Sequence, residues 1–171
     1  ILGMGYVGLT LAMVLADEGF HVTGIEPDSN ILDALRKKKA PFFEKGLDPL
    51  IERYCGNEFN VLPGLGDSSY DIYVVAVGTP VDSDGIPIMK DVETVLEQIS
   101  KVLKFNDLVI LRSTVPPRTC RDVAIPILEK GSGLKAGSGF HFVFAPERTV
   151  QGKALEELRL LPQIIGGYSL E

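Results

Sequence analysis

Apolar residues in this chain occur either in short continuous runs or at helical spacing in longer stretches. The continuous runs are typical of strands buried on both faces of a parallel sheet, and they fall at 22–26, 71–77, 108–111 and 140–144. Apolar positions at helical spacing predict helices at 6–18 and 92–103. Strands and helices therefore alternate, which indicates an α/β fold built on a doubly wound parallel sheet.

The segments between these elements are less regular. Gly19 is expected to end the first helix. The stretch 39–66 contains three prolines, and within it we expect a short helix at 47–54 and a short strand at 60–62. The glycine-rich stretch 131–139 is typical of an exposed loop that leads into the last predicted strand.

Length and charge narrow the range of functions. The 171 residues, 45% of them apolar, support one folded domain over 1–171. A net charge of −6 disfavours nucleic acids and anionic membrane surfaces as partners. No apolar run approaches the ~18 residues of a membrane span. The one basic run, at 36–39, is either a solvated helix end or a contact for a phosphate or a partner.

The cysteines and histidines suggest packing rather than chemistry. Cys55 and Cys120 lie far apart without metal-ligand spacing, so we expect no metal site and a reducing, cytoplasmic location. Neither His21 nor His141 has potential metal ligands beside it, and His141 is expected on a sheet face. The chain opens at Ile1 as if in the middle of a strand, so we expect a truncated first strand and a longer parent protein.

A glycine-rich motif at the start of the first helix points to a dinucleotide. Gly3, Gly5 and Gly8 fit G-x-G-x-x-G, the Rossmann turn in which glycines permit a tight bend, a close approach to a pyrophosphate and close helix packing. Glu26 ends the next predicted strand, where a carboxylate can bind the adenosine ribose diol and repel a 2′-phosphate. The pattern favours NAD over NADP. The alternative is an ordinary glycine turn and an incidental surface glutamate.

Polar residues follow three further predicted strands, at the sheet edge where ligands of open α/β folds bind. Gly78 and Thr79 come after 71–77, and they form either a cofactor contact or an ordinary turn. Ser113 and Thr114 follow the next strand. Their hydroxyls either cap the following helix or position a water near the reacting carbon.

The third cluster follows the strand at 140–144. Glu147 would be a carboxylate at the mouth of the sheet, and Arg148 would pair with it or with a substrate phosphate. A simple surface ion pair is the alternative. Each of these clusters alone could have a purely structural role. Because polar groups follow several strands in succession, a structural role for all of them together is a weaker explanation.

Together these motifs resemble a known family. In order, they are GMGYVGL, the acid Glu26, FFEKGLDPLI, VGTP, STVPP and APER. They resemble the N-terminal NAD-binding domain of the UDP-glucose/GDP-mannose dehydrogenase family over essentially the whole chain. The ending APERTVQGKALEELRLLPQIIGG is more similar to the branch that oxidises UDP-N-acetylhexosamines such as UDP-N-acetylmannosamine.

The resemblance implies an oxidoreductase of nucleotide-sugar metabolism and polysaccharide biosynthesis. Such an enzyme oxidises the C6 alcohol of a UDP-sugar to a uronate with two NAD, through a covalent cysteine adduct. It implies a homo-oligomer, a dimer, as the full-length parent. The catalytic Cys, Lys and Asn, the central helix and the UDP-sugar-binding domain would lie beyond Glu171, so this part alone is expected to be inactive. UDP-glucose 6-dehydrogenase and a free-standing NAD(H)-sensing Rossmann module are the alternatives.

The resemblance also implies roles for single residues. Glu26 would hold the adenosine ribose, Thr114 would help position a catalytic water, and Glu147, beside the sugar, would act as general acid/base or as electrostatic support. Gln151 falls where the glucose enzymes place a cofactor-contacting Glu. The remaining cofactor contacts would be Gly3, Gly5, Tyr6, Val7, Gly8, Gly78, Thr79, Pro80 and Ser113, and Arg148 would join Glu147 on the substrate. Ile31 and Arg118 depart from the family pattern.

Overall fold

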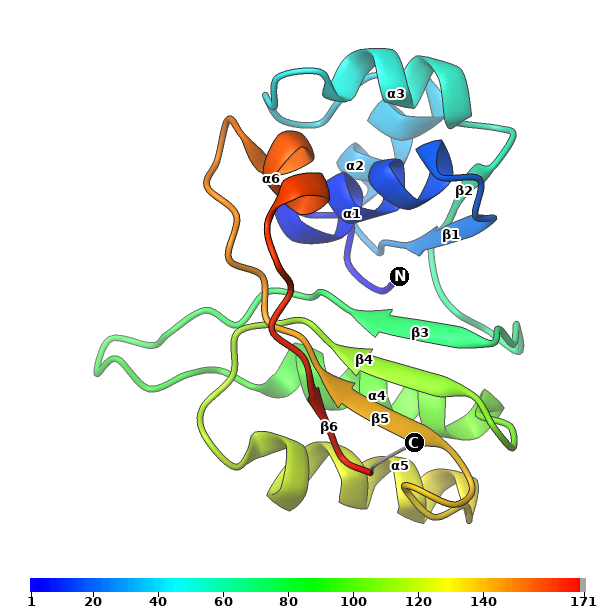
Figure 1. Ribbon diagram of the computed structural model, residues 1–171, viewed down its shortest axis with the longest axis vertical. Helices are drawn as coiled ribbons and strands as arrows, with labels where there is room; N and C mark the ends of the chain where they lie inside the picture. The colour runs from blue at the N-terminus through cyan, green and yellow to red at the C-terminus, as the bar shows by residue number, and fades with distance from the viewer. Residues whose placement is uncertain (170–171) are drawn as a thin grey trace. The chain divides into compact units, whose positions relative to one another are not determined.

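The computed structural model describes residues 1–169, and its chain folds into two compact units (Figure 1). The first unit contains 1–64 and 148–162, and the second contains 65–147 and the segment from 163 onward. Each unit is therefore built from two separate stretches of chain, and each has its own parallel strands.

The first unit packs helices against a short parallel ladder. Its elements are α1 (Tyr6–Asp17), β1 (Val22–Ile25), α2 (Ser29–Arg36), α3 (Leu47–Tyr54), β2 (Phe59–Leu62) and α6 (Ala154–Leu160). β1 and β2 are parallel with Val22 opposite Phe59, and Leu2 forms a parallel bridge with Ile25. α1 packs against β1, α3 and α6. The predicted helices at 6–18 and 47–54 and the strand near 60–62 are confirmed to within a residue or so at each end.

The core of the first unit explains why these segments form. Leu9 and Met13 of α1 are completely buried, and so are Leu47 of α3 and Phe59 of β2. α1 ends where expected, because Gly19 adopts a left-handed backbone with φ +89° that other residues rarely take.

The second unit holds a four-stranded sheet in the order β3-β4-β5-β6. Its elements are β3 (Ile72–Val75), α4 (Lys90–Val102), β4 (Leu108–Leu111), a π-helix η1 (Cys120–Ala124), α5 (Ile125–Ser132), β5 (His141–Phe144) and β6 (Gly166–Gly167). β3, β4 and β5 are parallel in continuous register, and β6 pairs antiparallel with β5. The segment between β3 and α4 extends away from this sheet (Figure 1).

Close helix packing in the second unit depends on a glycine. α4 and α5 pack together, and a Cβ built on Gly131 would lie 1.9 Å from Oγ of Ser100. The prediction of a loop over 131–139 is therefore wrong at its start, because α5 continues to Ser132 and ends at Gly133, which has φ +74°. Loop structure follows from there to Phe140, which is buried before β5 begins.

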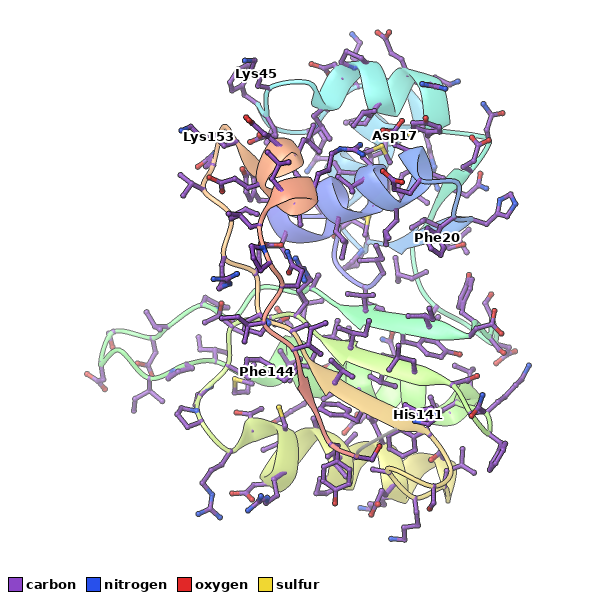
Figure 2. The ribbon with its side chains drawn as sticks, viewed as in Figure 1. Asp17, Phe20, Lys45, His141, Phe144 and Lys153 are labelled. Atoms are coloured by element: carbon purple, nitrogen blue, oxygen red, sulfur yellow. The ribbon has the colours of Figure 1, made fainter. Side chains whose placement is uncertain are left out.

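The predicted strands at 22–26, 71–77, 108–111 and 140–144 correspond to β1, β3, β4 and β5, and β3 is shorter than its apolar run. His141 begins β5, as expected of a residue on the sheet, and its Nε2 lies 3.1 Å from Oδ1 of Asn106 (Figure 2). No helix over residues 1–169 is both long enough and apolar enough to span a membrane.

Candidate functional site

The glycine-rich turn of the first unit leaves its backbone accessible at the start of α1. Gly3 is buried in a left-handed conformation with φ +95°, and its amide donates to the carbonyl of Ile25 at 2.8 Å. Gly5 is the exposed N-cap of α1, and a Cβ built there would meet no atom within 4 Å. The first turn of α1 contains no acidic residue. Open space at the start of a helix whose own first turn carries no acid suits an anion such as a pyrophosphate.

Glu26 is attached to this turn by a direct hydrogen bond. Its Oε2 accepts from the backbone amide of Met4 at 2.8 Å, and its Oε1 accepts from the amide of Asp28 at 2.9 Å. Glu26 is 8% exposed, so these are largely buried contacts. Each carboxylate oxygen has a second acceptor position, so the side chain keeps the capacity to bind a ribose diol. The residues present therefore fit a dinucleotide, with Gly5 beside the phosphates and Glu26 beside the ribose.

A second buried carboxylate, which the sequence analysis did not single out, lies in the irregular segment before α3. Oε2 of Glu44 accepts from the Tyr6 hydroxyl at 2.6 Å and from the amide of Gly152 at 2.7 Å. Its Oε1 accepts from the amide of Ala154 at 3.0 Å. Glu44 is 3% exposed. The only available signal was its place in FFEKGLDPLI, because neither its spacing nor its neighbours suggest burial.

This contact changes the chemistry of Tyr6. Burial and the hydrogen bond to Glu44 raise the pKa of the Tyr6 phenol to about 12. The phenol therefore stays protonated at neutral pH and donates to the carboxylate. The Tyr6 ring also packs at 5.6 Å from the ring of Phe42, so both ends of the side chain are held.

The other candidates of the first unit lie on the segment before α6. Gln151 is exposed, and the residues on both sides of it are held by hydrogen bonds. The Arg148 guanidinium donates to the backbone carbonyl of Pro162.

The last two candidates of the first unit belong to α1. Val7 lies in its first turn, and Gly8 is buried one residue further on.

In the second unit, the loops that follow β3 and β4 are joined. The Thr79 hydroxyl donates to the backbone carbonyl of Thr114 at 2.7 Å, and the Ser113 hydroxyl donates to the carbonyl of Val77 at 2.7 Å. The capping alternative for Ser113 is therefore wrong, because its hydroxyl ties one loop to the other. The helical segment that follows instead has Thr119 as its N-cap. Gly78, Pro80 and Thr114 are exposed, and a Cβ on Gly78 would meet no atom within 4 Å.

Glu147 forms a buried ion pair with Arg112, the residue that directly follows β4. The two side chains are 6% exposed for Arg112 and 8% exposed for Glu147. Arg112 also donates to the carbonyl of Ala145 at 3.2 Å, while its buried Nε has no hydrogen-bond partner in the described part of the chain. Arg112 is not among the predicted site residues, although a charged residue directly after an apolar strand is a signal for it.

The cysteines do not behave as nucleophiles. Burial raises the pKa of the Cys55 thiol to about 11, and burial also raises the pKa of Cys120. Both therefore stay thiols at neutral pH, which agrees with the structural role expected from the sequence. Within residues 1–169, no three His, Cys, Asp or Glu side chains are placed to hold a metal ion.

The predicted site residues thus fall into one set in each unit. The first unit holds Gly3, Gly5, Tyr6, Val7, Gly8, Glu26, Arg148 and Gln151, and the second holds Gly78, Thr79, Pro80, Ser113, Thr114 and Glu147. Within each set the structure joins residues far apart in sequence: Glu26 with the glycine-rich turn, Thr79 with Thr114, and Glu147 with the end of β4.

Comparison with known proteins shows where this chain belongs. It is 32% identical to a UDP-glucose 6-dehydrogenase of Haloferax volcanii, covering 98% of this chain and 40% of that protein. It is 30% identical to a UDP-N-acetyl-D-mannosamine dehydrogenase of Pyrococcus horikoshii, covering 99% of this chain and 40% of that protein.

The fold matches solved structures of the same kind. The crystal structure of a GDP-mannose dehydrogenase from Pseudomonas aeruginosa superposes with a TM-score of 0.92 and 30% identity, over 98% of this chain and 40% of that one. The predicted Rossmann-type α/β fold is therefore confirmed. The chain spans about 40% of the length of the relatives it matches. Residues 1–171 match the description "UDP-glucose/GDP-mannose dehydrogenase family, NAD binding domain", and the chain belongs to this family as its NAD-binding domain.

Proposed function

We propose that the protein carrying this chain oxidises the C6 alcohol of a UDP-N-acetylhexosamine to a uronate with two NAD. The observation that carries the cofactor half of this proposal is the buried contact of Glu26 with the glycine-rich turn. The sugar half rests on the resemblance of the ending of the chain, from Ala145 to Gly167, to the branch that oxidises UDP-N-acetylhexosamines.

In the first unit, the proposed roles are binding and orientation. The backbone at Gly3 to Gly8 would hold the pyrophosphate, Glu26 would accept hydrogen bonds from the ribose hydroxyls, and Gln151 would contact the cofactor. Bound NAD supplies the acceptor for the hydride that leaves the carbon under oxidation. A carboxylate at Glu26 would repel a 2′-phosphate, so NAD is the cofactor expected.

In the second unit, the proposed roles are to line the bound cofactor, to assist proton transfer and to position a water. Gly78, Thr79, Pro80 and Ser113 would line the cofactor, and the Thr114 backbone would be kept in place by Thr79. We propose that Glu147, held by its buried ion pair with Arg112, acts beside the sugar as general acid/base or as electrostatic support. The Thr114 hydroxyl would position the water. Arg148, which belongs to the first unit, would contact the substrate.

The remaining roles fall to parts of the protein beyond Glu171. We propose that the cysteine nucleophile and the UDP-binding residues lie there, that the full protein is a cytoplasmic homodimer of polysaccharide biosynthesis, and that residues 1–171 bind NAD without turning over substrate. Positioning accounts for much of such a rate, and a hydride acceptor without a held sugar lacks it.

The test is NADH formation by the full protein with a panel of nucleotide sugars. UDP-N-acetylmannosamine, UDP-N-acetylglucosamine, UDP-glucose and GDP-mannose would be compared by kcat/KM, together with the NADH formed per sugar. Two NADH per UDP-N-acetylhexosamine, with the highest kcat/KM, supports the proposal. A preference for UDP-glucose favours the main alternative.

A second alternative is an NAD(H)-sensing Rossmann module. It is favoured if NADH binds tightly and no sugar of the panel supports NAD reduction. Titration of NAD and NADP in the absence of sugar separates the two halves of the proposal, because cofactor binding does not depend on the identity of the sugar.

A further inference from the structure

The carboxylate of Glu44 joins three parts of the first unit that are distant in sequence. It accepts from the hydroxyl of Tyr6, the residue after the N-cap of α1. It also accepts from the amide of Gly152, just before α6, and from the amide of Ala154, the first residue of α6. Figure 2 labels Lys45, which follows Glu44, and Lys153, which lies between Gly152 and Ala154. Both lysines are exposed. The carboxylate itself is buried, and with three donors it is well satisfied.

The segment held in this way carries Gln151 at its centre. On one side of it, the amide of Val150 donates to Oε2 of Glu157 at 2.7 Å, and the carbonyl of Val150 accepts from Tyr6 at 3.3 Å. On the other side, the amide of Gly152 donates to Glu44 at 2.7 Å. The backbone is therefore fixed before and after Gln151, while the Gln151 side chain is exposed.

We propose that Glu44 is a positioning residue of the cofactor site, which holds the segment 150–152 against Tyr6 so that Gln151 is presented to the dinucleotide. The inference rests on the proposed function, in which Gln151 contacts NAD. It goes beyond that function by assigning the part of the chain that fixes Gln151. Glu44 itself touches neither cofactor nor substrate in this role.

The geometry explains why a carboxylate is needed at this position. Gly152 adopts φ +88°, a backbone conformation that keeps its amide directed at Glu44 and that other residues take at a cost. A glutamine at 44 would keep one acceptor oxygen but would place an NH2 group against donors. A buried amide without an acceptor is destabilised, so the segment would open locally before the unit unfolds.

The experiment compares Glu44→Gln with Glu52→Gln, the same change at an exposed position of α3. Hydrogen exchange of residues 150–154 would be measured in cofactor-free full-length protein, and the NAD dissociation constant by calorimetry. For Glu44→Gln we expect exchange at Gly152 and Ala154 to accelerate about tenfold, and the NAD Kd to rise about tenfold, as the loss of one charged hydrogen bond implies. For Glu52→Gln both quantities should stay within about twofold of the wild type.

A double mutant shows whether Glu44 acts through Gln151. Gln151→Ala should weaken NAD binding without faster exchange, and Glu44→Gln with Gln151→Ala should bind NAD no more weakly than the weaker single variant, within about twofold. Losses that multiply would overturn the inference. So would a Glu44→Gln variant with a lower Tm but unchanged NAD binding, because that is a structural role alone.

Two outcomes need separate treatment. If Glu44→Gln does not fold, Tyr6→Phe is used instead. It keeps the ring on Phe42 and removes the hydroxyl, which donates to Glu44 and accepts from the amide of Gly152 at 3.2 Å. It should raise exchange at Gly152 and the NAD Kd about threefold each. If neither changes, the inference fails. If wild-type protein binds no NAD, the proposed function fails and this inference with it, whereas normal NAD binding with unchanged exchange in Glu44→Gln overturns this inference alone.

Discussion

Glu26 accepts a hydrogen bond from the backbone amide of Met4 at 2.8 Å, so the acid that follows β1 is part of the glycine-rich turn. Glu26 was predicted to bind the cofactor, and this contact adds a structural task to that proposed role. The two tasks share one carboxylate, and a variant at this position should affect both stability and cofactor binding.

We expect Glu26→Ala to lower the free energy of unfolding and to weaken NAD binding. The buried amide of Met4 loses its acceptor, which costs about 1–3 kcal/mol. Glu26→Gln keeps one acceptor oxygen and should lose less stability. Urea denaturation and NAD titration measure the two effects. Equal NAD affinity in the wild type and Glu26→Ala would argue against the ribose assignment.

Cofactor preference should shift when the negative charge at Glu26 is removed and a cation is added nearby. Glu26→Ser combined with Asn30→Arg, on the exposed first turn of α2, removes the repulsion of a 2′-phosphate and adds a cation. The ratio of NADP to NAD affinity should rise about tenfold or more, which corresponds to roughly 1.4 kcal/mol. Asn30→Arg alone is the control. An unchanged ratio in the double variant would contradict the specificity argument.

Removal of one partner of the Arg112–Glu147 pair should strongly destabilise the protein. Arg112→Met leaves a buried carboxylate without its guanidinium, and breaking a buried pair in this way costs about 3–5 kcal/mol. Combination with Glu147→Gln removes the uncompensated charge, so the double variant should be more stable than Arg112→Met. Denaturant unfolding measures the stability of Arg112→Met, Glu147→Gln and the double variant. A double variant with the summed loss of both singles would show that the charges do not interact.

A cluster around Asp17, labelled in Figure 2, predicts the response of the first unit to acid. The Tyr54 hydroxyl donates to Oδ1 of Asp17 at 2.5 Å, and Arg159 donates to Oδ2 at 2.5 Å. The hydrogen bond from Tyr54, followed by that from Arg159, lowers the pKa of Asp17 below its ordinary value of 3.8. The ionised form is therefore favoured in the folded state, and its stabilisation is present above pH 3.8.

This stabilisation should be lost as the pH falls below 3.8 through the lowered pKa of Asp17. Asp17→Asn should make unfolding less dependent on pH in that range, and Asp67→Asn, at an exposed position, should leave the dependence unchanged. Thermal unfolding at a series of pH values measures this. The same slope in the wild type and Asp17→Asn would contradict the prediction.

The contact between α4 and α5 should not tolerate a side chain at Gly131. A Cβ there would lie 1.9 Å from Oγ and 2.5 Å from Cβ of Ser100, so the helices must move apart. Gly131→Ala should cost about 1–3 kcal/mol, the usual range for overpacking. Gly64→Ala, where a Cβ meets no atom within 4 Å, is the matched control. Equal Tm values for the two variants would show that the helices adapt freely.

The elements that could be predicted are those whose formation depends on local patterns. The strand at 108–111 has the bounds expected, because an apolar run specifies it without distant partners. The short helix expected at 47–54 also has the bounds observed. The start of the glycine-rich loop was misplaced because helix packing against Ser100 overrides the low helix propensity of Gly131.

The candidate site was predictable where a motif concentrates its residues. Gly3 to Gly8 and Glu26 follow from spacing that directly reflects the turn and the end of a strand. Glu44 and Arg112 were missed because their importance comes from burial against partners that lie far along the chain. The place of Arg112 directly after an apolar run was the local signal for it, whereas the burial of Glu44 has no sign in its spacing or its neighbours.

The bond between Glu44 and Gly152 also has a consequence for the order of folding. The two residues are 108 positions apart, so during synthesis the N-terminal helices must wait for most of the chain before this contact can form. Closing a loop of that length costs roughly 2 kcal/mol more in chain entropy than closing a loop of about ten residues. Contacts of such long range slow folding, and the buried carboxylate stays exposed to solvent until the segment before α6 has left the ribosome.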